Sequence, residues 1–270
     1  MRSALVTLLL VNFVLARPGG APVESEDKES LAQKARAAYY NLPRLGVASY
    51  RCEAVTEWGV MLAGEVDPEA LKKSAGTEIL NGIHIWMTIG KSGDPKFEQR
   101  LEGPISDPKR KEIVDTLVRK QEKVLTRFAR DVTRYMFTSM IPSPDQNYKL
   151  EEKDGHYVIS ESEGSSTANI TMDRDYRITE FNASLEKSNL KMNPQFIKTS
   201  RGYLLTSQHT EVKSSVPGES SVLSELLEYA EIDGVRLPSK LTAIVSLEGA
   251  PGGKSRTMQF TFRDFQIQKK

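Results

Sequence analysis

The stretch that decides the fold is LSELLEYAEIDGVRLPSKLTAIVSL, residues 223–247. Two segments with strand-like alternation, 223–232 and 235–247, flank the dipeptide Asp233-Gly234. Asp-Gly tolerates the positive φ angles that a two-residue type I′ turn requires, so it is a strong hairpin signal between two strands. In the second segment, residues 241–247 present one wholly apolar face. The stretch therefore predicts an antiparallel hairpin with one buried face.

The same pattern continues on both sides of this hairpin. Short alternating segments are divided by turn signals such as Lys153-Asp154-Gly155 and Asp173-Arg174-Asp175. The predicted strands are 148–152, 156–161, 168–172, 176–185, 223–232, 235–247 and 256–268. Consecutive strands without an intervening helix predict an antiparallel meander over 148–268. Residues 186–200 are less regular, and we expect a loop or a small helix there.

The last predicted strand has one apolar face, formed by Met258, Phe260 and Phe262. After Asp264 the apolar positions change from even to odd residue numbers, because Phe265 and Ile267 are now the apolar ones. This change predicts a β-bulge that bends the strand.

The N-terminal half is richer in helix signals. We expect a helix from Lys28 to about Leu42, a strand over 47–56, a short helix opened by Asp67-Pro68-Glu69, and a buried strand over 79–89. A much longer helix begins at the capping pair Asp107-Pro108 and runs to about Ser139.

The long helix is amphipathic. Its apolar side consists of Val114, Val118, Leu125, Phe128, Val132 and Met136. Its opposite side is basic and consists of Arg119, Lys123, Arg127, Arg130 and Arg134. A basic side can contact anionic lipid headgroups or another acidic surface. It can equally be a solvated side that keeps the helix soluble, and the modest size of most of its apolar residues favours this second interpretation.

These elements predict an α+β fold. A curved antiparallel sheet of half-barrel type is covered by the N-terminal helix and the long central helix. We expect one domain over 28–270, with a helix-rich part at 28–140 and the meander at 148–268.

Residues 1–16 have the pattern of a secretory signal peptide. A short positive segment precedes an apolar stretch from Ala4 to Leu15, and Val14-Leu15-Ala16 fits the cleavage rule. Residues 17–27 are rich in Pro, Gly and acidic residues and predict a flexible tether. We therefore expect an exported protein, periplasmic or extracellular, without a transmembrane segment once the signal is removed.

Composition narrows the function classes. The net charge is +1, which argues against bulk electrostatic binding of nucleic acid. Cys52 is the single cysteine, so no intramolecular disulfide can form. It lies in a strand-like segment and is expected to be a small buried residue.

The sequence nominates no catalytic residue, cofactor or metal. The three histidines, His84, His156 and His209, are scattered, and no P-loop, dinucleotide fingerprint or Gly-x-Ser-x-Gly motif occurs. Asn169-Ile-Thr and Asn182-Ala-Ser are formal glycosylation sequons.

One resemblance adds to these patterns. The segment Asp233-Gly234-Val235-Arg236-Leu237-Pro238-Ser239-Lys240, followed by a strand, a Gly-rich turn and a Phe-rich last strand, is similar to the closing hairpins of the LolA-like lipoprotein-carrier superfamily (LppX-type proteins included). The resemblance covers about 150–268. It implies an unclosed antiparallel barrel, covered by helices, whose apolar cavity holds acyl chains. The long central helix departs from that pattern, so the resemblance assigns no functional residue.

Three hypotheses follow. The leading one is a non-enzymatic protein that binds an apolar ligand or a lipid-modified partner, with Met258, Phe260 and Phe262 lining the site. The second is an interaction scaffold without a small-molecule ligand, which docks a partner through a sheet edge or the basic helix side. The third is a hydrolase whose carboxylates converge from distant segments.

Overall fold

The fold was analysed in a computed structural model, which describes residues 26–63, 75–216, 220–247 and 255–270. The predicted signal peptide, the tether up to residue 25, the Asp67-Pro68 helix start and the Gly-rich turn at 249–253 lie outside these residues.

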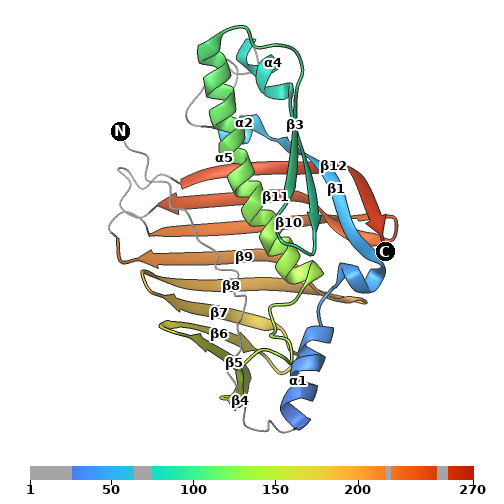
Figure 1. Ribbon diagram of the computed structural model, residues 1–270, viewed down its shortest axis with the longest axis vertical. Coiled ribbons are helices and arrows are strands. Elements are labelled where there is room, and N and C mark those ends of the chain that lie inside the picture. The colour runs from blue at the N-terminus through green and yellow to red at the C-terminus, as the bar shows by residue number, and fades with distance from the viewer. Residues whose placement is uncertain (1–25, 64–74, 217–219, 248–254) are drawn as a thin grey trace. The chain divides into compact units, whose positions relative to one another are not determined.

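The described strands form one open antiparallel sheet (Figure 1). The strands are β1 (Val47–Thr56), β2 (Ile83–Gly90), β3 (Lys96–Leu101), β4 (Lys149–Lys153), β5 (His156–Glu163), β6 (Ser166–Met172), β7 (Ile178–Leu185), β8 (Ser188–Thr199), β9 (Gly202–Ser214), β10 (Ser221–Ile232), β11 (Val235–Leu247) and β12 (Ser255–Lys269). Their hydrogen-bonded order is β3-β2-β1-β12-β11-β10-β9-β8-β7-β6-β5-β4. The predicted meander is confirmed.

Helices occupy a smaller part of the described chain. They are α1 (Glu26–Ala37), η1 (Leu42–Leu45), α2 (Trp58–Met61), α4 (Ala75–Asn81), α5 (Pro108–Val132) and η2 (Thr133–Phe137). The predicted capping of α5 is confirmed, because the Asp107 carboxylate accepts a hydrogen bond from the Lys109 N–H at 2.9 Å. The π-helix η2 continues α5 directly, so the helical segment ends close to the predicted Ser139.

The chain forms two compact units, and each contains helix and sheet. Unit 1 comprises residues 1–39, 139–225 and 244–256, and unit 2 comprises 40–138, 226–243 and 257–270. One of the boundaries between them lies between residues 138 and 139, and the predicted division at about residue 140 stays a prediction. One domain over 28–270 stays a prediction.

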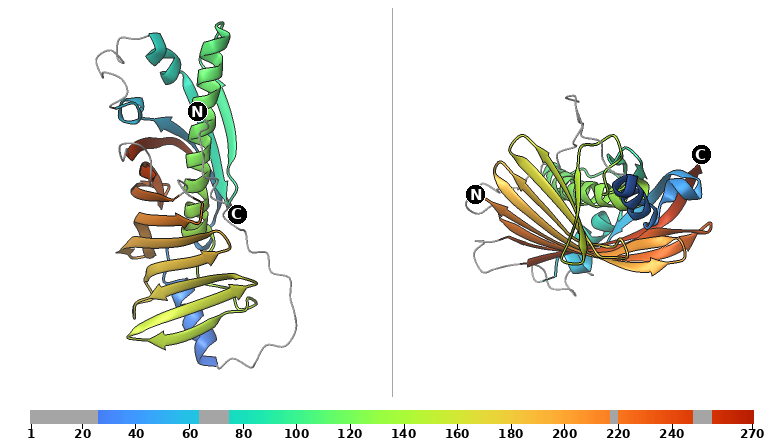
Figure 2. Two further views of the ribbon diagram at one scale, coloured as in Figure 1. Left: turned by 90° about the vertical axis from the view of Figure 1, so that its left-hand side faces the viewer. Right: turned by 90° about the horizontal axis from the view of Figure 1, so that it is seen from below.

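The core of unit 1 lies between α1 and the strands β4–β9 (Figure 2). Ala32 and Ala35 of α1 pack with Ile159, Ile170 and Ile178 of the sheet. The alternation of the strands explains this core, because positions of one parity point to the helix and those of the other parity face away.

The core of unit 2 lies beneath α5. All six residues of the predicted apolar side of the long helix are buried. Phe128 stacks on Phe262 of β12, with ring centroids 4.9 Å apart, and Tyr50 of β1 stacks on Phe137 of η2 at 6.2 Å. The amphipathic pattern therefore predicted correctly which side of α5 is buried.

Several sequence predictions are wrong. The first helix ends at Ala37 and not at about Leu42, where the separate helix η1 begins. The strands β3 and β9 were not predicted. Residues 79–81 belong to α4 and not to a strand, because the helix continues to Asn81 and ends before Gly82. Residues 188–199 form the strand β8 and not a loop. Pro194 and a register shift after Gln195 interrupt the alternation of this strand, so its pattern is hidden in the sequence.

The predicted bulge in the last strand is confirmed. Asp264 has a φ of 53°, in the left-handed region. The β1–β12 register shifts there: Arg51 lies opposite Gln266, while Glu53, two residues on, lies opposite Arg263. The extra residue on β12 explains why the parity of its apolar positions changes.

Candidate functional site

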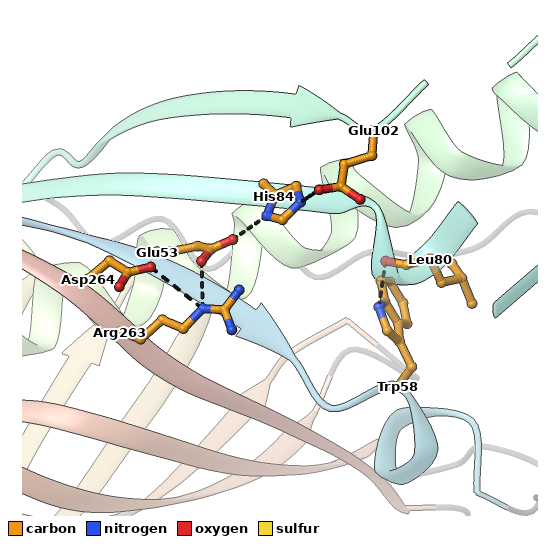
Figure 3. Close-up of polar contacts among 7 residues, drawn as sticks. All are labelled: Glu53, Trp58, Leu80, His84, Glu102, Arg263 and Asp264. Carbon is orange, nitrogen blue, oxygen red and sulfur yellow. Dashed lines mark hydrogen bonds and ion pairs between the residues drawn. The ribbon is translucent and has the colours of Figure 1, made fainter. Parts of the chain in front are cut away.

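A row of alternating charges crosses the strands of unit 2 (Figure 3). Glu53 on β1 lies opposite Arg263 on β12. On its other side Glu53 lies opposite Trp86 on β2, so His84 is its diagonal neighbour on the same face. Glu102 directly follows β3, the partner strand of β2, and completes the row. The strand register therefore places cation, anion, imidazole and anion in sequence.

Glu53 is the buried member of this row, since its side chain is only 3% exposed. Arg263 Nε donates a hydrogen bond to Glu53 Oε2 at 2.7 Å, and His84 Nδ1 bonds to Glu53 Oε1. His84 Nε2 lies 3.1 Å from Glu102 Oε1. Arg263 Nε also lies 3.7 Å from the Asp264 carboxylate. Both imidazole nitrogens thus face carboxylates, an arrangement that favours protonated imidazole.

The electrostatic consequences follow from these contacts. Burial raises the pKa of Glu53, but hydrogen bonds from Arg263 and His84 outweigh burial and hold that pKa below its ordinary value. The hydrogen bond to Glu53 raises the pKa of His84 against partial burial, and Glu102 adds to the rise. The row can hold and exchange a proton near neutral pH.

Trp58 supports the same region from α2. Its indole Nε1 donates to the Leu80 carbonyl at 2.9 Å (Figure 3). This carbonyl lies in the last turn of α4, where backbone oxygens lack helical partners. The bond ties α2 to the end of α4, beside the strand that carries His84.

The predicted ligand-lining residues are part of the packed core of unit 2. Phe260 is fully buried, Phe262 is 3% exposed beneath Phe128, and Met258 is half-buried. Of the three, Phe262 contacts α5 through its stacking on Phe128. Their role as a ligand wall stays a prediction.

Two polar groups in the same core have no partner among the described residues. Gln121 of α5 is completely buried, and both its amide nitrogen and its amide oxygen lack a hydrogen bond there. Tyr50 is 1% exposed, and its hydroxyl is likewise unpaired in the described part of the chain. Burial raises the pKa of Tyr50, so the phenol stays neutral. Buried side-chain amides without a hydrogen-bond partner are rare in native cores. The Gln121 amide is therefore a position where a ligand could supply the missing hydrogen bonds.

The structure pairs much of the predicted basic side of α5 with acidic residues. Asp131, itself only 6% exposed, lies 3.1 Å from Arg134 and 3.9 Å from Arg127. Arg130 lies 3.1 Å from Asp94. The two remaining members, Arg119 and Lys123, are exposed. Contact of this side with a partner stays a prediction.

The remaining chemistry-bearing residues are separate from the charged row. Cys52 is buried and burial raises the pKa of its thiol, so the thiolate that nucleophilic chemistry needs is disfavoured. His156 Nδ1 contacts the Asp154 carbonyl at 3.0 Å. His209 Nε2 lies 3.4 Å from Glu211 Oε1, and its Nδ1 lies 3.0 Å from Ser224 Oγ.

No group of three or more His, Cys, Asp or Glu side chains in the described part of the chain is arranged to hold a metal ion. Among those same residues, no helix combines the length and the apolar character needed to cross a membrane.

The sequence prediction missed the charged row. Alternation alone assigns Glu53 to the wet side of β1, next to Cys52 and Ala54 on the buried side. The sequence does show a glutamate, a histidine and an arginine in three separate segments with apolar neighbours. Whether these side chains lie next to one another depends on the strand order and register, which the sequence does not reveal.

In comparisons with known proteins, no family model matches the chain, and no curated protein matches it. Among solved structures, it is similar to a porin-like protein from Bacteroides uniformis, at 8% identity and a TM-score of 0.19. That match covers 82% of this chain and 98% of the other. A similarity at this TM-score carries no argument about fold or function.

Proposed function

We propose that the protein binds an amphipathic ligand, with an apolar body and a hydrogen-bonding head, beneath α5 in unit 2. The observation that carries this proposal is the buried amide of Gln121, which lacks a partner among the described residues. It lies on the same side of α5 as Val118, Leu125 and Phe128, at helical spacing. A ligand head could satisfy the amide, and a ligand tail could contact the apolar side chains.

The energetics make α5 a displaceable cover. A buried amide without a partner costs about 1–3 kcal/mol relative to an apolar side chain of the same shape. The packing of the buried side of α5 is therefore weaker than that of a wholly apolar helix side. A ligand that inserts between Phe128 and Phe262 loses their stacking but gains apolar contact and a hydrogen bond. A lipid or a lipid-modified partner has this chemistry.

Titration with a dansyl-labelled fatty acid tests the proposal. The wild-type protein is expected to bind the probe with enhanced dansyl fluorescence. Gln121→Leu removes the polar partner and strengthens the closed packing, so it is expected to lower affinity at least about tenfold, as the loss of one buried hydrogen bond predicts. The matched control Gln195→Leu makes the same change at an exposed position of β8.

Two outcomes contradict the proposal. One is wild-type protein that leaves the probe fluorescence unchanged. The other is Gln121→Leu protein that binds as tightly as wild type, since the ligand head would then not contact the amide. Thermal unfolding of both variants checks that they are folded, and Gln121→Leu is expected to unfold at a higher temperature than wild type.

A second candidate function is an interaction scaffold without a small-molecule ligand. The observation that favours it is the direct stacking of Phe128 on Phe262 over the buried Phe260, which fills this part of the core. Arg119 and Lys123 are the exposed members of the basic side. If they dock an acidic partner, Arg119→Glu with Lys123→Glu abolishes co-purification of that partner and leaves probe binding unchanged.

Export forms part of the same proposal. A carrier of lipid-type ligands would act outside the cytoplasm, as the signal-peptide pattern of residues 1–16 predicts. N-terminal sequencing of exported protein is expected to start at or near Arg17. Exported protein that retains Met1 would remove this part of the proposal.

A further inference from the structure

The sheet of unit 1 carries a polar cavity on the face that points away from α1. Its volume is about 310 Å³, within the range of small-molecule sites. The polar lining includes Asn169, Asn182, Asn189, Lys191, Glu211 and Lys213. Ala183 of β7 and Leu190 of β8 complete the lining with apolar surface.

The strand register arranges the lining in two parallel rows. In one row Asn169 lies opposite Asn182, Asn182 opposite Lys191, and Lys191 opposite Glu211. In the other row Thr167, Ser184, Asn189 and Lys213 follow one another across the same four strands. Neighbouring strands are about 4.8 Å apart, so each row offers a hydrogen-bonding group at that interval.

Several of these groups are held in place before any ligand arrives. Glu180 accepts a hydrogen bond from Asn182 Nδ2 at 2.5 Å and lies 2.8 Å from Lys191 Nζ. Ser160 Oγ donates to Asn169 Oδ1 at 2.7 Å, which leaves the amide N–H groups of Asn169 to act as donors toward the cavity. Glu180 is thus a positioning residue for Asn182 and Lys191. Such preorganisation lowers the cost of ordering side chains upon binding.

The charges around the cavity nearly cancel. Lys191 and Lys213 are balanced by Glu211 in the lining and by Glu180, which pairs with Lys191, so charge does not select an anion. Asparagine amides both donate and accept hydrogen bonds, as hydroxyl groups do, and the hydroxyls of Thr167 and Ser184 add the same capacity. A lining of this kind matches a ligand that presents many neutral hydroxyl groups at close spacing.

We propose that this cavity binds a neutral polyhydroxylated ligand of the oligosaccharide class. The site is separate from the position beneath α5 and does not depend on the function proposed for it. Its residues lie in unit 1, whereas Gln121 and Phe262 lie in unit 2.

Isothermal titration of the full chain with maltohexaose, cellohexaose and chitohexaose tests this inference. At least one of the three is expected to bind, and Asn189→Ala is expected to weaken that binding about tenfold, as loss of one hydrogen-bond partner of the ligand predicts. Asn182→Ala with Asn189→Ala is expected to abolish it. The matched control Gln195→Ala removes an amide from an exposed position of the same strand, β8, outside the cavity lining, and is expected to bind like wild type.

Three results would overturn the inference. The first is an absence of binding by all three oligosaccharides at millimolar concentration. The second is equal binding by Asn189→Ala and wild type. The third is binding of inorganic phosphate at this cavity without binding of the sugars, since the site would then select an anion. Dansyl fatty-acid titration of the same variants separates this inference from the proposed function, because binding of that probe is expected to stay unchanged.

Discussion

Glu53 is the residue on which the charged row of unit 2 depends. It is almost fully buried, yet it contacts a cation on one side and an imidazole on the other. Removing one partner of a buried charge pair leaves the other uncompensated, which costs more than the pair contributes. Arg263 is half exposed, so solvent can compensate part of the loss on its side.

Glu53→Gln is therefore expected to lower the free energy of unfolding by about 1–3 kcal/mol. The loss has two causes, the missing charge toward Arg263 and the amide that must replace an acceptor toward His84. Urea denaturation measures it. The control Glu98→Gln changes an exposed carboxylate paired with Arg51 and is expected to cost less than about 1 kcal/mol. Equal costs for the two variants would show that burial of Glu53 has no energetic role.

The row also predicts how stability depends on pH. The folded state raises the pKa of His84, so its stabilisation is complete below the unfolded value near 6.5 and is lost as pH rises through the folded value. The folded state lowers the pKa of Glu53, so that contribution is present above the unfolded value near 4.3 and is lost as pH falls through the folded value. The row is therefore expected to stabilise most in mildly acidic solution, at about pH 5 to 6.

Thermal unfolding at mildly acidic and mildly basic pH measures this dependence. Wild type is expected to lose stability on the basic side, and His84→Gln is expected to lose much of that difference. His156→Gln serves as control, since His156 contacts only a backbone carbonyl among the bonds described for its side chain. The same pH dependence in wild type and His84→Gln would contradict the assignment.

At the residue scale, the sequence pattern predicts the burial of apolar side chains but not of polar ones. The buried side of α5 and the burial of Cys52 follow from periodicity, because apolar side chains at regular intervals lie on one side of a helix or strand, and that side packs on the core. The burial of the polar side chains of Glu53, Gln121 and Tyr50 does not follow from periodicity. It depends on strands and helices that are distant in the sequence and pack against them in the fold. The sequence therefore predicts most of the core but not the polar groups within it.

At the scale of elements, the open sheet must protect two end strands. In the described sheet these are β3 and β4, with the sequences KFEQRL and KLEEK. Charged side chains on a short end strand disfavour pairing with another molecule. The alternative that a partner docks by adding a strand is therefore not favoured at either end.

Lys149→Val with Glu151→Val in β4 removes these charges from one end. This variant is expected to form dimers and larger assemblies, because unpaired backbone groups then lie beside an apolar surface. Size-exclusion chromatography with light scattering measures the effect. The control Asn193→Val with Gln195→Val makes a similar change on β8, which has paired strands on both sides, and is expected to stay like wild type. A monodisperse β4 variant would refute this role of the charges.

The element predictions succeeded where turn chemistry marked the boundaries. β1 and β11 have the predicted bounds, and the bulge at Asp264 follows from a change in parity. β8 was hidden because Pro194 and its neighbouring register shift break the alternation. β3 was missed because its six residues are mostly polar and end-strand positions need not alternate.

At the scale of the whole molecule, the chain combines an open antiparallel sheet with two units that each have their own core. In unit 2, α5 packs on β12 through the stacking of Phe128 on Phe262. If a ligand binds beneath α5 as proposed, its entry requires this helix to move. Ligand entry would first separate the stacked rings of Phe128 and Phe262. It would also bring a hydrogen-bonding group to the amide of Gln121, which has no partner among the described residues.

Native mass spectrometry of the protein purified from its own host tests this central claim most directly. The account predicts a population with the added mass of a lipid-type molecule, which is displaced by excess dansyl fatty acid and reduced in Gln121→Leu. A spectrum that contains only the bare polypeptide, from protein that also fails to bind the fatty-acid probe, would contradict it.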